Sequence, residues 1–421
     1  MSTLANQRRQ KTVVLAHPGT QYSYETALAL QEAGLLAGYI TGFYYKPQST
    51  LARALRLLPN GRRAQLEREF LRRFKPGLAS KNIRTFPLLE LPFVASSRLR
   101  SLRCFSDAVL RWRNRQFESR LVALLDRERP AAVVCYDTSA QRTFERAKSL
   151  GISCVLDQSI AHLRTGLRLL REEAELQPDF ADSLPTKVPE WLVEQCSQEA
   201  LLAECVLSPS EYVRQSLIAN GVEPTRIVAV PFGVDPEQFQ PGGPRLEKTF
   251  RVLFVGQLSQ RKGIKYLLEA FRDLRLPGAE LVLVGSIVGS GRGLQCYRDV
   301  FQHIPNVPHS EVHQWFERAD IFVYPSLHEG SALAIYEAMA CGLPVITTPN
   351  SGSVVQDGIH GYIVPLRDVE LLKEKILLLY ENRELCQEMS RKARLRAEEF
   401  TWAAYRRRLA LVVLNLLAAK G

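Results

Sequence analysis

Short apolar runs alternate with helix-length stretches along the whole chain, and this alternation limits the folds that the chain can adopt. In the first half such runs lie at 12–16 (TVVLA), 131–135 (AAVVC) and 152–156 (ISCVL), and each is followed by a polar loop. Strands that read as unbroken apolar runs are buried on both faces, as in parallel sheets that helices cover on either side. The pattern therefore predicts an α/β protein with doubly wound parallel sheets.

The alternation is interrupted between residues 230 and 248, where four prolines and three glycines occur, and it then starts again. Since 421 residues exceed the size at which one core usually stops growing, we expect two domains. The predicted parts are a first domain at 1–230, a linker at 231–248, a second domain at 249–400 and a C-terminal segment at 401–421.

The second half repeats the pattern of the first. The predicted strands and helices are strands at 251–255, 280–284, 321–324 and 344–347, helices at 262–271 and about 332–340, and helical sequence from 369 to the end. Both halves are therefore expected to be Rossmann-like.

Composition and cysteine spacing are those of an ordinary globular protein. Apolar residues make up 46% and charged residues 24%, which excludes a disordered or collagen-like chain. The basic residues 1–11 lack an apolar core and are not expected to be a signal peptide, and the apolar run at 409–419 is too short to span a bilayer. The eight cysteines form no C-x-x-C pair, so we expect reduced thiols and a cytoplasmic location.

Much of the net charge of +11 lies between Lys46 and Arg120, where 18 basic residues accompany 5 acidic ones. Such a region attracts an anionic membrane surface, nucleic acid or a phosphorylated substrate, or it is simply a solvated helical surface. No nucleic-acid-binding pattern accompanies it, so nucleic acid is the weaker prediction.

The segment HEGSALAIYEAMACG, which begins at residue 328, is the most informative about chemistry. It enters a predicted helix whose first turn holds the small residues Gly330, Ser331 and Ala332. Small residues leave backbone N–H groups accessible and a helix N-terminus adds partial positive charge, so this turn suits a diphosphate. Carboxylates beside a diphosphate need hydroxyl partners, and sugar and ribose hydroxyls would serve Glu329 and Glu337. Taken alone, the two residues are equally a helix-terminal charge and a surface acid.

A second loop between a predicted strand and helix, 256–263 (GQLSQRKG), contains Arg261 and Lys262. Both side chains can pair with phosphate, and Arg261 offers a bidentate fork. The alternative is that they only lie on the surface at a helix start. Cations there oppose the helix dipole, which favours another use for them.

Four features occur together: the E-x7-E spacing of Glu329 and Glu337, R-K-G at 261–263, V-P-F-G-V-D at 230–235, and A-M-A-C-G-L-P-V-I-T-T at 338–348. In this combination they resemble the GT-B retaining glycosyltransferases of family four, over about residues 207–401. The resemblance implies two Rossmann-like domains that face a central cleft, with the acceptor on the first domain and a nucleotide sugar on the second. It also implies that the final helix, within 400–417, crosses back to the first domain.

The resemblance implies roles for the matched positions of the second domain. Arg261 and Lys262 are expected to neutralise the donor diphosphate. Glu329 is expected to bind hydroxyls of the donor sugar as a catalytic residue, and Glu337 to bind the ribose. The backbone of three residues is expected to hold the phosphates: Gly330, Ser331 and Ala332.

In the first domain the resemblance implies that Gly19 brings backbone close to the donor and that His162 lies near the reacting carbon as a second catalytic residue. A structural role for His162 is the alternative. The sequence departs from the family pattern at Gln257, where an arginine is common, and in the loop after the first strand, which reads H-P-G-T from His17.

No metal and no cofactor are expected. The Asp-x-Asp pair with which many sugar transferases of another fold hold a divalent ion does not occur, so the helix N-terminus, Arg261 and Lys262 are expected to bind the diphosphate without metal. His309 and His313 are spaced like a metal pair, but Ser310 reads as an N-cap of the helix that holds His313, which favours structural roles.

We therefore expect a retaining glycosyltransferase that moves a sugar from a UDP-sugar or GDP-mannose to a glycan, lipid-linked or small-molecule acceptor. It would act in the cytoplasm, on or near the inner face of the plasma membrane, in bacterial surface polysaccharide or glycolipid synthesis. The alternatives are a GT-B sugar-nucleotide epimerase and a non-catalytic module that binds nucleotide sugars.

Overall fold

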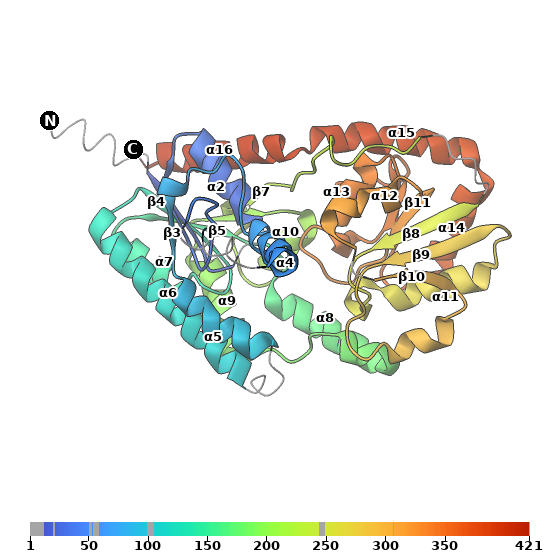
Figure 1. Cartoon of the computed structure of the whole chain (residues 1–421), viewed down its shortest axis with the longest axis horizontal. Coiled ribbons are helices and arrows are strands. Elements are labelled where there is room, and N and C mark those ends of the chain that lie inside the picture. Colours follow the sequence, from blue (N-terminus) through green and yellow to red (C-terminus); the bar gives the residue numbers. More distant parts are fainter. Residues whose placement is uncertain are drawn as a thin grey trace.

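The computed structural model describes residues 12–19, 22–49, 53, 59–98, 105–243, 249–305 and 307–420. These residues form two parallel β-sheets that lie side by side, each flanked by helices (Figure 1). The prediction of an α/β fold with two doubly wound sheets is confirmed.

The first sheet has seven strands in the order β3-β2-β1-β4-β5-β6-β7, all paired in parallel. Its strands are β1 (Val13–His17), β2 (Leu36–Thr41), β3 (Ile83–Thr85), β4 (Ala132–Tyr136), β5 (Ser153–Asp157), β6 (Cys205–Ser208) and β7 (Ile227–Ala229). The α-helices of this part are α2 (Ser23–Glu32), α4 (Asn60–Leu71), α5 (Pro87–Arg98), α6 (Ser106–Glu128), α7 (Gln141–Ser149), α8 (Leu163–Leu176), α9 (Glu190–Leu202) and α10 (Glu211–Ile218). The 3-10 turns are η1 (Ser80–Asn82), η3 (Pro178–Ser183) and η4 (Pro224–Arg226).

The second sheet has six parallel strands in the order β10-β9-β8-β11-β12-β13. Its strands are β8 (Phe250–Val255), β9 (Ala279–Val284), β10 (Phe301–Ile304), β11 (Ile321–Tyr324), β12 (Val345–Thr347) and β13 (Gly361–Ile363). The α-helices that follow β8 are α11 (Ile264–Leu274), α12 (His313–Phe316), α13 (Leu333–Ala340), α14 (Val369–Glu381), α15 (Arg383–Glu399) and α16 (Trp402–Ala418). The 3-10 turns are η5 (Gln260–Lys262), η6 (Arg292–Tyr297), η7 (His309–Glu311) and η8 (Pro349–Ser351).

The two faces of the first sheet bury different helices. Val13 and Leu15 of β1 belong to the core that includes α2 and α16, whereas Val14 and Ala16 pack with α6, α7, α9 and α10. Successive side chains of a strand point to opposite faces, so an unbroken apolar run fills both layers. This is why the short apolar runs of the sequence become interior strands.

The prediction of helical sequence from residue 369 is confirmed, and the structure divides it into three helices, α14, α15 and α16. Two side chains end one helix and begin the next: Asn382 accepts the amide of Leu385 at 2.9 Å, and Thr401 accepts the amide of Ala404 at 3.1 Å. Such N-caps compete with continued helix because they satisfy the amides of a new first turn. The chain can therefore turn before α16.

Helix α16 lies against the first domain, as expected, and runs beside α2 (Figure 1). Tyr405 is hydrogen-bonded to Thr26 at 3.0 Å, and Arg406 forms ion pairs with Glu25 at 2.7 Å and Glu32 at 3.0 Å. The chain thus crosses between the two sheets twice.

The two crossings contact each other. The amide of Val234 donates to the carbonyl of Phe400 at 2.9 Å, and the amide of Trp402 donates to the carbonyl of Val234 at 3.3 Å. Phe232, in the first crossing, packs against the rings of Trp402 and Tyr405 in the second. The V-P-F-G-V-D segment is therefore one half of a paired connection.

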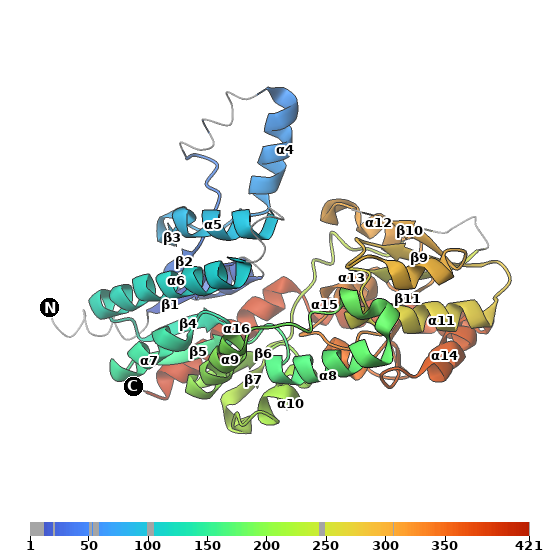
Figure 2. The same cartoon turned by 90° about the horizontal axis from the view of Figure 1, so that it is seen from below.

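The basic stretch between Lys46 and Arg120 is only partly described, because 50–52, 54–58 and 99–104 lie outside the described residues. Several of its described cations have partners: Arg84 pairs with Glu128 at 2.7 Å, and Lys75 pairs with Glu25 at 2.5 Å. Helix α4 projects away from the rest of the first domain (Figure 2). None of the helices in the described ranges is long and apolar enough to span a membrane.

Candidate functional site

A cleft of about 770 Å³ lies between the two sheets. The first domain lines it with Tyr22, Tyr24, Glu25, Arg72, Lys75, Ser159 and Ile160. The second part of the chain lines it with Arg261, His309, Glu329, Gly330, Ser331, Leu333 and Trp402. A cleft of this size at a domain boundary is a common ligand site.

Two loops of the second domain, around Arg261 and around Leu327, are hydrogen-bonded to each other at the wall of this cleft. The carbonyl of Arg261 accepts the amide of Leu327 at 2.9 Å and the hydroxyl of Ser326 at 3.1 Å. Gly263 follows with φ of 69°, and a Cβ there would lie 2.0 Å from the carbonyl oxygen of Pro325. Only glycine fits this conformation and this close approach, which explains the third residue of the R-K-G sequence.

The carboxylate of Glu329 is bound by the two neighbouring cations. Its Oε1 lies 2.8 Å from Nη1 of Arg261, accepts the hydroxyl of Ser326 at 3.1 Å, and forms an ion pair with Nζ of Lys262. Lys262 also lies over the ring of Tyr324, 5.1 Å from its centroid. The acid and both cations that the sequence singled out thus converge, and the carboxylate offsets one of the two positive charges.

Burial and charge act in opposite directions on this group of residues. Burial raises the pKa of the Glu329 carboxyl, but the charges of Lys262 and Arg261 outweigh it, so the pKa lies below its ordinary value. Burial lowers the pKa of Lys262 to about 8, against the attraction of Glu329. Glu329 is therefore ionised at neutral pH, and the charge of Lys262 depends on pH near neutrality.

The turn before α13 combines a close approach of the two domains with unused amide groups. A Cβ on Gly330 would lie 1.9 Å from the carbonyl oxygen of Ser159, so glycine is required there for the domains to meet. The amide of Ala332 already donates to the carbonyl of Ser351 at 3.0 Å. The amides of Gly330 and Ser331 donate no hydrogen bond to any described residue. Two of the three amides expected to hold phosphate are therefore free.

Glu337 has a partner that the sequence did not indicate. Its Oε1 lies 2.9 Å from Nε2 of His309, whose side chain is exposed and also lines the cleft. The hydrogen bond to Glu337 raises the pKa of His309. The pair lies at the edge of the cleft, on the side of the second domain.

The metal-like spacing of two histidines has no counterpart in the structure. His313 has its Nε2 3.9 Å from Glu317, whereas His309 faces Glu337. The N-cap of α12 is Val312 without a side-chain hydrogen bond, so the expected capping by Ser310 is wrong. Among the described residues, no three His, Cys, Asp or Glu side chains form a group that could hold a metal ion.

Gly19 and His162 lie outside the residues that line the cleft. The carbonyl of Gly19 accepts the hydroxyl of Thr41 at 3.2 Å. His162 is the N-cap residue of α8, and its Nδ1 accepts the amide of Arg164 at 3.3 Å. Burial, with a smaller effect of Arg164, lowers the pKa of His162 to about 4, so its ring is neutral. The geometry of His162 is that of a helix cap.

The cleft is also lined by the aromatic side chains of Tyr22 and Trp402, which the sequence motifs did not predict. Tyr22 donates its hydroxyl to Asp157 at 2.7 Å and packs against Phe232 with ring centroids 4.2 Å apart. Trp402 reaches the cleft from the C-terminal crossing. Neither belongs to a spaced motif: Tyr22 follows the loop that begins at His17, and Trp402 lies in the predicted C-terminal segment at 401–421.

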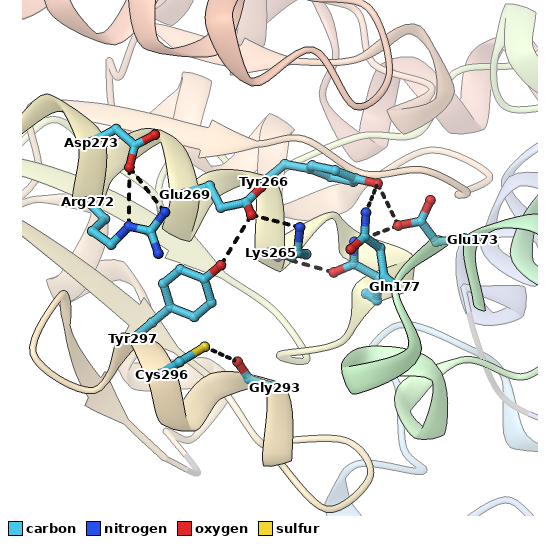
Figure 3. A network of polar contacts seen from close by, with 11 residues as sticks. Glu173, Gln177, Lys265, Tyr266, Glu269, Arg272, Asp273, Gly293, Cys296 and Tyr297 are labelled. Carbon is cyan, nitrogen blue, oxygen red and sulfur yellow. Dashed lines mark hydrogen bonds and ion pairs between the residues drawn. The ribbon is translucent and has the colours of Figure 1, made fainter. Parts of the chain in front are cut away.

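Outside the lining of the cleft, α8 of the first domain packs against the second domain through a buried carboxylate. Glu173, which is fully buried, accepts hydrogen bonds from Tyr266 at 2.7 Å and Gln260 at 2.7 Å and forms an ion pair with Arg367 at 2.8 Å. Figure 3 shows Glu173 of α8 pointing toward Tyr266 of α11. This contact lies directly beside the loop that carries Arg261, so it fixes that loop relative to the first domain.

Comparison with known sequences identifies relatives over part of the chain. Residues 236–396 match the family model described as glycosyl transferases group 1. A D-inositol 3-phosphate glycosyltransferase from Paenarthrobacter aurescens is 30% identical over 203 residues, which are 43% of this chain and 50% of that protein. The amylovoran biosynthesis glycosyltransferase AmsK from Erwinia amylovora is 29% identical over 197 residues, which are 42% and 47% of the two chains. The chain thus spans about half the length of the curated relatives it matches.

Solved structures resemble the whole chain. Sucrose-phosphate synthase from Thermosynechococcus elongatus superposes with a TM-score of 0.64 and 19% identity, over 97% of this chain and 100% of its own. HepE of Anabaena, in complex with UDP, superposes with a TM-score of 0.60 and 14% identity, over 96% and 100%. The likeness shows that the GT-B fold extends through both domains.

Proposed function

Because residues 236–396 belong to the glycosyl transferases group 1 family, we propose that this chain transfers a sugar from a nucleotide-diphosphate sugar to an acceptor hydroxyl, with retention of the anomeric configuration. The observation that carries the proposal is the convergence of Glu329, Arg261 and Lys262 at an interdomain cleft. Cations suit a diphosphate and a buried carboxylate suits sugar hydroxyls.

Donor binding would exchange the partners within this group. The diphosphate takes Arg261 and Lys262 as its counter-ions, and the free amides of Gly330 and Ser331 donate to its oxygens. The carboxylate of Glu329 is then released from both cations and accepts hydrogen bonds from hydroxyls of the donor sugar. Without donor, Arg261, Lys262 and Glu329 together carry one net positive charge, and the diphosphate supplies the negative charge that offsets it.

The proposed reaction breaks the bond between the anomeric carbon and the diphosphate oxygen and forms a bond from that carbon to the acceptor oxygen. The departing nucleoside diphosphate carries the bonding electron pair and takes up the acceptor proton. Arg261, Lys262 and the two amides stabilise the negative charge that develops on the leaving group. Attack from the face that the leaving group vacates retains the configuration.

A role in polysaccharide or glycolipid synthesis is part of the proposal. It is supported by AmsK, whose name places it in amylovoran biosynthesis. We place the reaction in the cytoplasm, on or near the inner face of the plasma membrane. The donor is a UDP-sugar or GDP-mannose, and HepE, which has been solved with UDP and with UDP-glucose, makes UDP the first nucleotide to test.

The substitution Glu329→Gln separates donor binding from transfer. Transfer should fall by roughly a hundredfold or more, because the amide is a poorer acceptor for sugar hydroxyls than the carboxylate. UDP affinity should stay equal or increase, because Arg261 and Lys262 no longer have an internal counter-ion. Product formation from radiolabelled donor and calorimetric UDP binding measure the two quantities.

Glu311→Gln is the matched control, since Glu311 is an exposed acid on η7 close to the cleft. It should change neither quantity. Transfer that survives in Glu329→Gln would remove the assignment of Glu329. Conversion of the donor sugar without any acceptor would instead favour an epimerase.

Calorimetric titration with UDP, GDP and ADP, each with and without EDTA, identifies the donor class. We expect one nucleotide to bind selectively and its affinity to be unchanged by EDTA, since Arg261 and Lys262 supply the positive charge. Binding that disappears with EDTA would contradict the metal-free proposal. A failure of all three nucleotides to bind would favour a module that has lost its donor.

A further inference from the structure

A second cavity, of about 700 Å³, lies in the first domain between the projecting helix α4, helix α5 and the loop after β2. Its apolar lining consists of Phe43, Leu66, Phe70, Pro87, Leu91 and Val94. A volume of this size with mostly apolar walls is typical of a ligand pocket rather than a packing defect.

The helix that forms one wall is attached to the domain by a small aromatic cluster. Phe70 of α4 stacks on Tyr45, with ring centroids 5.6 Å apart, and contacts Phe43 at 5.6 Å. This cluster is separate from the two main cores. Figure 2 shows α4 standing away from the sheets. Leu91, which lines the cavity, is 63% exposed.

Positive charge joins this cavity to the cleft between the domains. Arg72 lines both, and Arg73 lines the cavity beside it. Neither guanidinium forms an ion pair with a carboxylate in the described part of the chain. Although the carboxylates of Glu69 and Glu90 also line the cavity and Arg73 acts electrostatically on Glu90, two cations at the junction suit an anion that spans it.

A buried carboxylate of the cavity, Glu90, has one oxygen that accepts no hydrogen bond from the described residues. Glu90 is only 7% exposed, and its Oε1 has no hydrogen-bond partner among the described residues, while its Oε2 lies 3.7 Å from Arg113. Burial raises the pKa of Glu90, although the charges of Arg113 and Arg73 oppose this. A buried acceptor without a donor is costly unless a ligand supplies one, and a hydroxyl is such a donor.

We propose that this cavity holds the hydrocarbon chain of a lipid-linked acceptor whose head group carries a phosphate, bound at Arg72 and Arg73, and hydroxyls. The inference rests on the proposed function, since it names the acceptor of the same cleft. One hydroxyl of the head group meets Glu90, and another reaches past Arg72 toward Glu329. The apolar walls would contact the hydrocarbon chain, Arg72 and Arg73 the phosphate, and Glu90 a hydroxyl of the head group.

Binding of decyl phosphate, below its critical micelle concentration, tests the proposal directly. We expect wild-type protein to bind decyl phosphate more tightly than decyl glucoside, which lacks the phosphate, and methyl phosphate, which lacks the chain. Calorimetry on the full chain measures all three. Equal binding of methyl phosphate and decyl phosphate would overturn the role of the apolar cavity.

Two exposed leucines of α5 provide a matched pair of variants. Leu91 lines the cavity, whereas Leu88 is 77% exposed and does not. Leu91→Glu should weaken decyl phosphate binding about tenfold or more, because it places a charge in the apolar wall. Leu88→Glu should leave it unchanged. An equal loss in both variants would mean non-specific adsorption and would overturn the proposal.

Arg72→Gln separates the head group from the chain. It should reduce decyl phosphate binding to the level of decyl glucoside and leave decyl glucoside binding as in wild type. Unaltered preference for the phosphate would contradict the assignment of Arg72. UDP binding, measured in parallel, keeps the two proposals apart: loss of decyl phosphate binding with UDP binding intact removes the lipid acceptor only, and absence of UDP binding removes the donor site.

Discussion

One ionisable residue at the wall of the interdomain cleft, Lys262, changes its charge close to neutral pH. Lys262 is buried between Glu329 and the ring of Tyr324, and burial lowers its pKa from 10.5 to about 8. The positive charge that Lys262 contributes beside Glu329 therefore depends on pH.

UDP affinity should decrease as the pH rises from 7 to 9. Below a pKa of about 8 Lys262 is protonated and attracts phosphate, and above it the neutral amine does not, so the expected loss is about tenfold across this range. Calorimetry at constant ionic strength measures it. Lys262→Arg is the control, because arginine stays charged and should flatten the profile; a decline of equal size in that variant would assign the titration to another group.

At the residue scale the sequence indicated which side chains carry charge in the cleft but not what they touch. Glu329, Arg261 and Lys262 were singled out from short motifs, and the structure brings them together. The contact between Glu337 and His309 was not foreseen, because the two residues belong to different loops. Motifs report residue types along the chain, whereas a contact depends on how two distant loops are oriented.

At the scale of elements, helix α7 shows how one element is stabilised by its neighbours. Ala140, its N-cap residue, has no side chain that can accept a hydrogen bond. Glu199 of α9 instead accepts the amides of Thr138 and Ala140, both at 2.7 Å, and Glu118 of α6 accepts the amide of Arg142 at 2.9 Å. Two buried carboxylates from other helices thus serve as the cap.

Glu199→Gln should destabilise the first domain. The amide group presents N–H to at least one of the two backbone donors, so a buried hydrogen bond is lost, at a cost of about 1–3 kcal/mol in the free energy of unfolding. Urea denaturation followed by fluorescence measures the change. Glu194→Gln on the same helix is the control: its exposed ion pair with Arg164 contributes about 0–1 kcal/mol. Equal effects would contradict the capping role.

The strands were easier to predict than the ends of helices. The predicted strand at 321–324 coincides with β11, and β5 begins and ends one residue after the predicted 152–156. An interior strand is a short apolar run with polar residues on both sides, so its limits are visible. A separate final helix within 400–417 was predicted, but the break at Asn382 was not, because helical periodicity continues across it and its cap depends on a single hydrogen bond.

On the scale of the whole molecule, the relative placement of the two domains depends on a few buried polar contacts. Glu173 of α8 joins three groups of the second domain, and Arg367 is shared with its neighbour Glu172 at 2.6 Å. The sequence predicted two domains and a cleft but not this contact. Its residues come from α8, η5, α11 and the loop before α14, and no local pattern connects them.

Glu173→Ala should weaken the contact between the domains. The substitution leaves Arg367, Tyr266 and Gln260 without their buried acceptor, and removing one partner of a buried ion pair costs about 3–5 kcal/mol. Thermal unfolding should begin at lower temperature, and small-angle scattering should show a larger radius of gyration. Glu172→Ala removes the exposed partner of the same arginine and should have little effect. If both variants behave like wild type, the contact does not hold the domains.

Because α16 packs against the first sheet, the first domain can complete its core only after α16 has been translated. Tyr405, Leu409 and Val413 fill the same core as Leu15 of β1, although nearly the entire second domain is translated between them. At about 5–20 residues per second, translation from the end of β7, the last strand of the first sheet, to Tyr405 takes roughly 10–35 s. Throughout it, the face of the nascent first sheet that α16 will cover is exposed to chaperones, and the domain that begins first is finished last.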